Sequence, residues 1–402
     1  MKLAMRVISF CHYLQGPAAT QYLADLGADV IKVEPLGGAF ERYWSGGKSF
    51  VNGVSAFLLS ANRNKRSLAI DLKNPKSRDV MLQLIKSVDV IVENFRPGVL
   101  DRLGYGYDAI RERKPDIIYA SATGLGVDGP DATRPGQDLL MQARSGLVAA
   151  TGSNGPTIVG AAVVDQHGAS LLAMGILAAY VRKLQTGKGT RVETSLLQAA
   201  LDLQTEALTF YFARCAKGDV MRRSVNIGSW YHDAPYGAYA LADCHIVLSM
   251  NDPGKLADAL ASDILRDLAG IDRYEERERY ASAVAAELRG RRFSDVAPRF
   301  DSAGIWFERV QSYDDLTVDR QLAHIGAFTE FPVGDSRVKL VAHPLRYDGV
   351  SPEIRIMPLQ PGCDSRAILS ECNLDDEAIE RLVSEGVVGS PTVSTGASQY
   401  DE

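Results

Sequence analysis

The chain is poor in cysteine, has no long hydrophobic run and carries no strong excess of charge, and each shortage argues against a class of protein. Its five cysteines, at positions 11, 215, 244, 363 and 372, form no Cys-x-x-Cys pair and no zinc-ligand spacing. We therefore expect reduced thiols, a cytoplasmic location and no bound metal. The longest apolar stretch, residues 171–181, is far shorter than the roughly 20 residues that span a bilayer. The first residues lack an apolar signal core and a cleavage site, so we expect neither a membrane span nor export.

The composition is that of a globular protein with more than one domain. The 402 residues are 46% hydrophobic and 23% charged, and the formal net charge is −6. A chain of this length exceeds the usual size of one hydrophobic core. Its slightly negative charge provides no field that attracts nucleic acid, so we expect no nucleic-acid partner, and local basic clusters have to hold any polyanionic ligand.

Short β-rich runs alternate with helical patterns in the first 150 residues. The patterns predict strands at 6–10, 29–34, 88–93 and 116–121, and helices at 17–26 and 74–87. This alternation is typical of βαβ units around a parallel sheet, in which ligands bind at the carboxyl ends of the strands.

The pattern changes in the second half of the chain. The stretch from Thr190 to about residue 217 reads as helical, 229–250 as turn-rich and strand-like, and 252–292 as polar helix. These changes indicate a domain boundary near residue 220. We interpret the charged run 273–280 as a solvated helix face.

The first βαβ pattern imitates a nicotinamide-binding unit, because Glu34 ends its second strand. The intervening turn, residues 11–17, lacks the Gly-x-Gly-x-x-Gly pattern that lets a pyrophosphate approach the backbone. We therefore expect no dinucleotide cofactor, and we interpret Glu34 as a solvated strand end.

Asp165 is a candidate nucleophile. It lies where a strand-like stretch gives way to a helical pattern that begins near Ala169, and small neighbours such as Gly160 and Gly168 leave room for a substrate to approach it. The positive end of a helix macrodipole favours an ionised carboxylate there. The alternative is that Asp165 simply caps the helix.

Basic and amide side chains recur in four short segments that suit phosphate groups, at 62–67, 69–73, 93–98 and 100–104. Asn94 and Phe95 follow a predicted strand, where they can flank an adenine or a pantetheine arm. Each segment taken alone is also compatible with a solvated surface loop.

Several segments, in order along the chain, resemble the class III coenzyme A transferases. They are Gln15–Pro17, Leu26–Glu34, Asn64–Ser67, Asp71–Lys73, Val92–Gly98, Gly124–Pro130 and Gly187–Leu197. That family includes formyl-CoA, carnitine and mesaconyl-CoA transferases and the related α-methylacyl-CoA racemases. The stretch from Ala234 to Asp243 is similar to the entry of its small domain.

The resemblance implies an α/β fold and an interlocked homodimer. We expect a large Rossmann-like domain with a parallel sheet, built from residues 1–220 and from a C-terminal segment, 326–402. A smaller α+β domain, 221–325, is expected between them. The apolar helix predicted at 168–180 suits a buried dimer interface, although an ordinary core helix explains it equally well.

The resemblance also implies that Asp165 attacks an acyl-CoA thioester, giving a mixed anhydride and then an aspartyl-CoA thioester. CoA is a substrate in this chemistry, and no permanent cofactor is needed. The expected partners are an acyl-CoA, for which we expect succinyl-CoA, and a small carboxylic acid, for which we expect a four- or five-carbon dicarboxylate.

Further site residues follow from the same resemblance. Gln15 is expected near the reacting acyl group as an oxyanion donor, and Asp138 beside the substrate or, alternatively, as the N-cap of its own helix. The residues expected to bind CoA are His12, Leu72, Lys73, Asn94, Phe95, Arg96, Arg102 and Arg134. At His12 the backbone matters more than the ring.

Two other functions remain open. Racemase relatives carry a histidine base where this chain has Gln137, and glutamine cannot transfer a proton at neutral pH, so racemization is disfavoured. A non-catalytic CoA-binding protein is the other alternative. Residues 226–232 replace a glycine run of the oxalate-type enzymes, which puts oxalate specificity in doubt. His167 and His232 are possible pocket residues without an assigned role.

Overall fold

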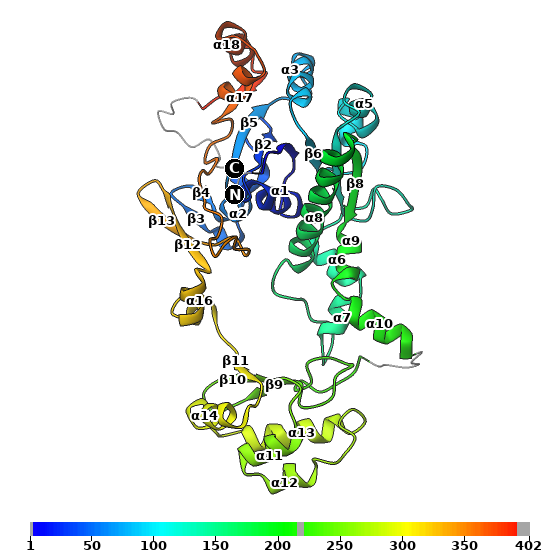
Figure 1. Cartoon of the computed structure of the whole chain (residues 1–402), viewed down its shortest axis with the longest axis vertical. Coiled ribbons are helices and arrows are strands. Elements are labelled where there is room, and N and C mark those ends of the chain that lie inside the picture. Colours follow the sequence, from blue (N-terminus) through cyan, green and yellow to red (C-terminus); the bar gives the residue numbers. More distant parts are fainter. Residues whose placement is uncertain (1–2, 215–220, 392–402) are drawn as a thin grey trace. The chain divides into compact units, whose positions relative to one another are not determined.

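The computed structural model describes residues 3–214 and 221–391, which form two compact units (Figure 1). The first unit takes in the chain up to residue 141, residues 162–200 and the chain from residue 321 onward. The second unit consists of 142–161 and 201–320. Cys215 lies outside the described residues.

A seven-stranded sheet forms the centre of the first unit. Its spatial order is β14-β5-β2-β1-β6-β7-β8. The strands are β1 (Arg6–Phe10), β2 (Asp29–Glu34), β5 (Lys65–Ile70), β6 (Val90–Glu93), β7 (Ile118–Thr123), β8 (Thr190–Ser195) and β14 (Val388–Gly389). All but β14 are parallel to their neighbours, and in chain order these six strands follow the Rossmann order 3-2-1-4-5-6. The predicted parallel α/β sheet is therefore confirmed.

Helices cover both faces of this sheet. Alternate strand residues feed two separate cores: Ile8 and Phe10 of β1 pack in one, and Val7 packs in the other. The first core includes residues of α3 (Pro75–Lys86), α5 (Tyr107–Arg113), α17 (Ser365–Glu371) and α18 (Asp376–Ser384). The second is formed with α1 (Gln15–Asp25) and α8 (Val163–Thr186). Burial on both faces explains why strands such as β1 and β6 are rich in valine and isoleucine.

Smaller elements complete the first unit or continue from it. They are η1 (Phe40–Arg42), η2 (Gly46–Lys48), β3 (Phe50–Val51), β4 (Val54–Ser55), α2 (Ala56–Ala61), α4 (Val99–Leu103), α6 (Asp138–Arg144), α9 (Leu196–Asp202), α16 (Arg320–Ile325), β12 (Phe328–Val333) and β13 (Ser336–Val341).

The second unit has its own core and is of the α+β type. Three antiparallel strands in the order β11-β10-β9 pack with helices around Tyr239, Tyr280 and Phe300. The elements are α7 (Leu147–Thr151), α10 (Thr205–Arg214), β9 (Gly237–Ala240), β10 (His245–Leu248), α11 (Pro253–Leu260), α12 (Asp263–Asp267), α13 (Arg277–Leu288), α14 (Phe293–Ala303), β11 (Phe307–Arg309) and α15 (Tyr313–Leu316).

Two predictions of secondary structure were wrong. The stretch after Thr190 was expected to be helical, but it begins with strand β8, whose polar residues alternate because it lies at the sheet edge. Helix α8 begins at Val163 and not near Ala169. The second unit also differs from the expected range 221–325, because it starts earlier and includes 142–161. There the buried guanidinium of Arg223 donates to the carbonyls of Ala150, Thr151 and Gly152.

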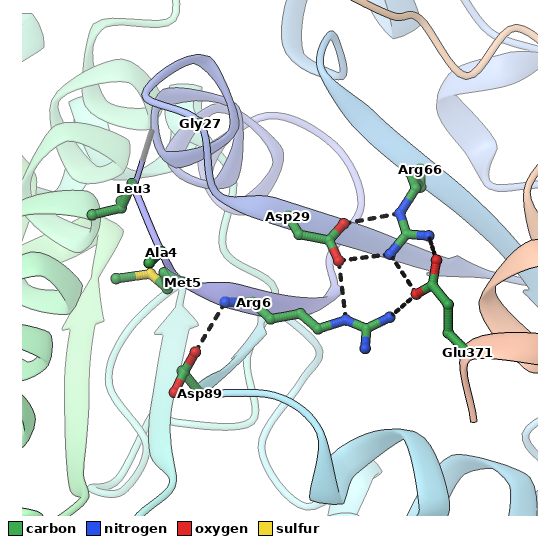
Figure 2. A pocket seen from close by; sticks show the side chains of 9 residues that line it. All are labelled: Leu3, Ala4, Met5, Arg6, Gly27, Asp29, Arg66, Asp89 and Glu371. Atoms are coloured by element: carbon green, nitrogen blue, oxygen red, sulfur yellow. Dashed lines mark hydrogen bonds and ion pairs between the residues drawn. The ribbon is translucent and has the colours of Figure 1, made fainter. Parts of the chain in front are cut away.

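An ion-pair ring closes the amino ends of the strands (Figure 2). Arg66 donates to Asp29 at 2.6 Å and to Glu371 of α17 at 2.7 Å, and Arg6 pairs with the same two carboxylates. The ring lines an open pocket of about 500 Å³. It ties the returning C-terminal segment to the start of the sheet, on the edge opposite the carboxyl ends.

None of the helices within residues 3–214 and 221–391 is long and apolar enough to cross a membrane.

Candidate active site

The turns after β1 and β6 meet at the carboxyl edge of the sheet, where the strand order reverses. The Asn94 side chain joins them: its Oδ1 accepts the backbone N–H of His12 at 3.0 Å, and its Nδ2 donates to the His12 carbonyl at 2.7 Å. Ligands of open α/β sheets bind at such a switch point. The sequence expectation that the His12 backbone matters fits this arrangement, in which Asn94 holds the backbone.

Asp165 lies in the first turn of α8 and is half-buried. Burial, and after it the negative charge of Asp138, raises the pKa of Asp165 to about 7. We expected the helix macrodipole to favour the ionised form; desolvation and the like charge of Asp138 act in the opposite direction. Within residues 3–214 and 221–391, the Asp165 carboxylate makes no hydrogen bond or ion pair, so none has to be broken before it reacts.

Asp138 caps the helix that carries Asp165. It is the first residue of α6, and its Oδ1 accepts the backbone N–H groups of Val164 at 2.8 Å and of Asp165 at 3.1 Å. The cap therefore serves the neighbouring α8. This contact brings two carboxylates together, and the charge of Asp138 adds to the effect of burial on the pKa of Asp165.

Gln15 begins α1 and is almost completely buried. Its Nε2 has no hydrogen-bond partner among the described residues. The amide lies against α8: a Cβ atom on Gly168 would stand 2.5 Å from Nε2. Gly168 is three residues beyond Asp165, and residues at that spacing share a helix face. A buried amide without a partner is costly, and it is satisfied when a ligand accepts its hydrogen bond.

The remaining predicted CoA-binding residues follow neighbouring strands. Leu72 and Lys73 come after β5, and Phe95 and Arg96 come after β6. The Phe95 ring lies 5.0 Å from the His12 ring. Lys73 and Arg96 are exposed, so their charged ends are available to phosphate.

Two further arginines lie farther along the chain. Arg102 lies on α4 and is exposed. Arg134 lies in the segment between β7 and α6, where its guanidinium pairs with Asp131 at 3.4 Å. The structure therefore collects most of the predicted set at one edge of the sheet, while Arg134 arrives from a separate segment.

Two charged segments expected at the surface are buried. Arg63 pairs with Asp25 at 2.7 Å, and Asn64 Nδ2 donates to the same carboxylate, so these residues are not available to a phosphate. Glu34 was interpreted as a solvated strand end. Instead it is buried and pairs with Arg42 at 2.6 Å.

In the second unit the loop 223–236 is tightly held. Arg277 Nη1 donates to the Trp230 carbonyl at 2.7 Å, and the His232 ring stacks on Tyr236 at 4.0 Å. His232 also lines a pocket of about 570 Å³ together with Arg273. His167, in contrast, belongs to the first turns of α8 in the other unit.

A Rossmann-order sheet that carries an acid and an unpartnered amide at its carboxyl edge defines an α/β enzyme architecture. The family model described as CoA-transferase family III matches residues 4–365, and the chain therefore belongs to this family. It is an enzyme of the CoA-transferase type.

Relatives named as CoA-transferases support the same family. The chain is 32% identical to a succinyl-CoA:glutarate CoA-transferase of Mus musculus, over 96% of this chain and 89% of the relative. It is 36% identical to a succinyl-CoA:mesaconate CoA-transferase of Haloarcula hispanica, over 61% of this chain and 63% of the relative. A CAIB/BAIF family protein from Brucella suis has a similar structure, with a TM-score of 0.78, 25% identity and coverage of 92% and 98%.

Proposed function

We propose that this enzyme transfers CoA from succinyl-CoA to a four- or five-carbon dicarboxylic acid. The contact between the Gln15 amide and the helix face that bears Asp165 carries the proposal. It puts a nucleophile and an unpartnered donor beside one another, as acyl transfer requires. The relatives named for glutarate and mesaconate support the choice of acid.

Asp165 is the proposed nucleophile. Its carboxylate attacks the thioester carbonyl, the C–S bond breaks, and CoA leaves as a thiolate while a mixed anhydride forms. The thiolate then attacks the aspartyl carbonyl, which releases the donor acid and leaves an aspartyl-CoA thioester. The acceptor carboxylate repeats both steps in reverse and regenerates Asp165. Atoms and charge balance at each step without a co-reactant.

Gln15 and Asp138 assist in different ways. The Gln15 amide donates to the oxygen that becomes negative as each tetrahedral intermediate forms. Asp138 fixes the start of α8 through its two accepted hydrogen bonds and keeps the pKa of Asp165 high. A carboxylate of higher pKa is the stronger nucleophile once it is ionised.

CoA lies along the carboxyl edge in this proposal. Lys73, Arg96 and Arg102 pair with its phosphates, while Leu72 and Phe95 contact its apolar parts. The Asn94 side chain and the His12 backbone, which are hydrogen-bonded to each other, lie beneath the pantetheine arm. Arg134 approaches from the segment before α6.

We also propose that two copies form an interlocked homodimer. Helix α8 presents apolar side chains to the outside of its unit, with Met174 61%, Val181 53% and Leu184 69% exposed. Exposed apolar side chains on one helix suit an interface. Sedimentation velocity of the whole chain tests this, and a monomer at micromolar concentration contradicts it.

The function is tested by intact-mass analysis after incubation with succinyl-CoA, acetyl-CoA and oxalyl-CoA, with hydroxylamine added to trap the intermediate. We expect a modification at Asp165 that is absent from Asp165→Ala. Tight CoA binding without an adduct from any donor overturns the covalent mechanism. Entry of solvent deuterium at the α-carbon of a branched acyl-CoA would identify a racemase instead.

A further inference from the structure

The turn that carries His12 and Gln15 has an unfavourable backbone. It connects β1 to α1, and Tyr13, which is not a glycine, has a φ of 60°. A residue other than glycine is strained at positive φ, and such a conformation persists only where the surrounding structure enforces it. The turn therefore needs external support to keep the Gln15 amide in its position.

Side chains from three neighbouring strands or strand ends provide this support. Asn94, after β6, binds the His12 backbone at both its polar groups. Lys32 of β2 donates from Nζ to the Cys11 carbonyl at 3.0 Å, and Lys65 of β5 donates to the Pro17 carbonyl at 2.8 Å. The two lysines thus bind the two ends of the turn.

Lys65 is an unusual residue to bury. It is 1% exposed, and its Nζ donates only to neutral oxygens: the carbonyls of Pro17 and Ala61, both at 2.8 Å, and Asn62 Oδ1 at 3.0 Å. No carboxylate lies within ion-pair distance among the described residues. Burying an ammonium group without a counter-ion is costly, and an apolar side chain of similar length would avoid that cost.

Lys32 differs because it has a counter-ion. Its Nζ lies 2.5 Å from Glu41 Oε1, and both side chains are buried. Burial, and after it the positive charge of Lys32, holds the pKa of Lys65 well below its usual range. Removing Lys32 would leave the Glu41 carboxylate buried without a counter-ion, which is destabilising in itself. Substitution of Lys65 therefore tests the support of the turn more directly.

We propose that Lys65 is a positioning residue for acyl transfer: its ammonium group holds the turn from Cys11 to Pro17 so that the Gln15 amide meets the reacting acyl group. This inference rests on the proposed function. Lys65 itself touches neither substrate nor Asp165; it acts through the Pro17 carbonyl, two residues beyond Gln15. Misplacement of a donor by about 1 Å is enough to slow a reaction up to 100-fold.

The variant Lys65→Met keeps the length of the side chain and removes its three donors. We expect kcat to fall at least tenfold, while KM for acyl-CoA changes less than about threefold, since the exposed basic residues still bind the phosphates. Lys183→Met is the matched control, because that lysine binds Asp89 and Asp116 far from the turn. It should leave kcat unchanged.

Cys11 gives a readout that does not depend on catalysis. Its thiol is buried in the turn, beside Gly16, and Cys372 is buried elsewhere in the same unit. Pulse labelling of the native protein with N-ethylmaleimide, followed by peptide mass spectrometry, compares the two. In Lys65→Met we expect Cys11 to label at least tenfold faster and Cys372 to stay protected.

Other outcomes overturn the inference. Faster labelling of both cysteines means that Lys65 supports the whole unit, and unchanged labelling of Cys11 means that it does not hold the turn. Faster labelling of Cys11 with an unchanged kcat means that catalysis does not use the turn. If wild-type protein shows no CoA transfer, the proposed function fails by itself, and the labelling still tests the structural part.

Discussion

The side-chain amide of Gln15 occupies the space that a side chain at Gly168 would fill. A Cβ atom at that position would lie 2.5 Å from Gln15 Nε2 and 3.4 Å from the Ala199 Cβ. Small residues around Asp165 were first interpreted as room for a substrate. A side chain of the protein fills the space beside Gly168 instead. The Gln15 amide lies there, between helices α1 and α8.

Gly168→Ala should therefore reduce activity without unfolding the protein. Alanine is favoured over glycine within a helix by about 1 kcal/mol, whereas the new methyl group displaces the Gln15 amide. We expect kcat to fall about 100-fold, the cost of removing one oxyanion donor, with little change in Tm. Steady-state kinetics of Gly168→Ala, Gln15→Ala and the double variant measure this. If the losses of activity in the two single variants add up in the double variant, the two substitutions do not act through the same amide. Gly160→Ala, where the methyl group meets open space, is the control.

The pH dependence of kcat/KM should report Asp165. Because its pKa is raised to about 7 and the nucleophile is the ionised form, activity should rise with pH through about 7. In Asp138→Asn, Oδ1 can still accept the two N–H groups, but the negative charge is gone. The acid limb should move to lower pH. A limb at the same pH would mean that another group controls it.

The charge of Asp165 should also lower stability at neutral pH. A carboxyl group whose pKa is higher in the folded than in the unfolded state destabilises the fold as pH rises from about 4 to about 7. Asp165→Asn should therefore be inactive but raise Tm at pH 8, and the difference from wild type should shrink at pH 5. Thermal melts at both pH values measure this. A lower Tm at pH 8 is the opposite of what we expect.

Removing Glu371 should loosen the C-terminal segment only slightly. Hydrogen bonds from Arg66 hold the pKa of Glu371 below its usual value, so its contribution is present above pH 4.5 and is lost as the pH falls further. The side chain is 43% exposed, so we expect Glu371→Gln to cost at most about 1 kcal/mol. Urea unfolding at pH 7 with low and high salt measures the cost, which salt should reduce. The turnover rate should not change.

Arg96→Gln should weaken acyl-CoA binding through lost charge. We expect KM for acyl-CoA to rise about five- to tenfold with kcat unchanged, since the guanidinium acts on the phosphates and not on the reacting carbon. Arg381→Gln, an exposed arginine on α18, is the control. A fall in kcat without a change in KM would place Arg96 near the acyl group.

The sequence predicted best where local pattern decides the structure. The ranges expected for the first two strands coincide with β1 and β2, because the β-rich run of each strand gives way at once to turn residues, from Cys11 and from Pro35. Strand β8 was not predicted because its alternating exposure reflects its place at the sheet edge. That place depends on pairing with β7, whose residues are 72 positions away in the sequence.

The buried charges could not be predicted from their neighbours in sequence. Arg63 reads as surface because its partner, Asp25, is 38 residues away, and the partner of Glu34 lies on the following 3-10 turn. The site itself was found by resemblance: Asp165 and Gln15 are 150 residues apart, and no local pattern relates them. Their meeting through Gly168 required the structure.

The amide of Asn94 is chemically a peptide group, and it binds the His12 backbone as a residue of a third strand would. The backbones of β1 and β6 stop pairing at Phe10 and Glu93. One further pair of hydrogen bonds follows, and a side chain makes it. The Asn94 side chain thus continues the hydrogen bonding between the two segments beyond the last paired residues of the strands. Aspartate would have nearly the same shape but would present a second acceptor to the His12 carbonyl, so the hydrogen bond to that carbonyl would be lost.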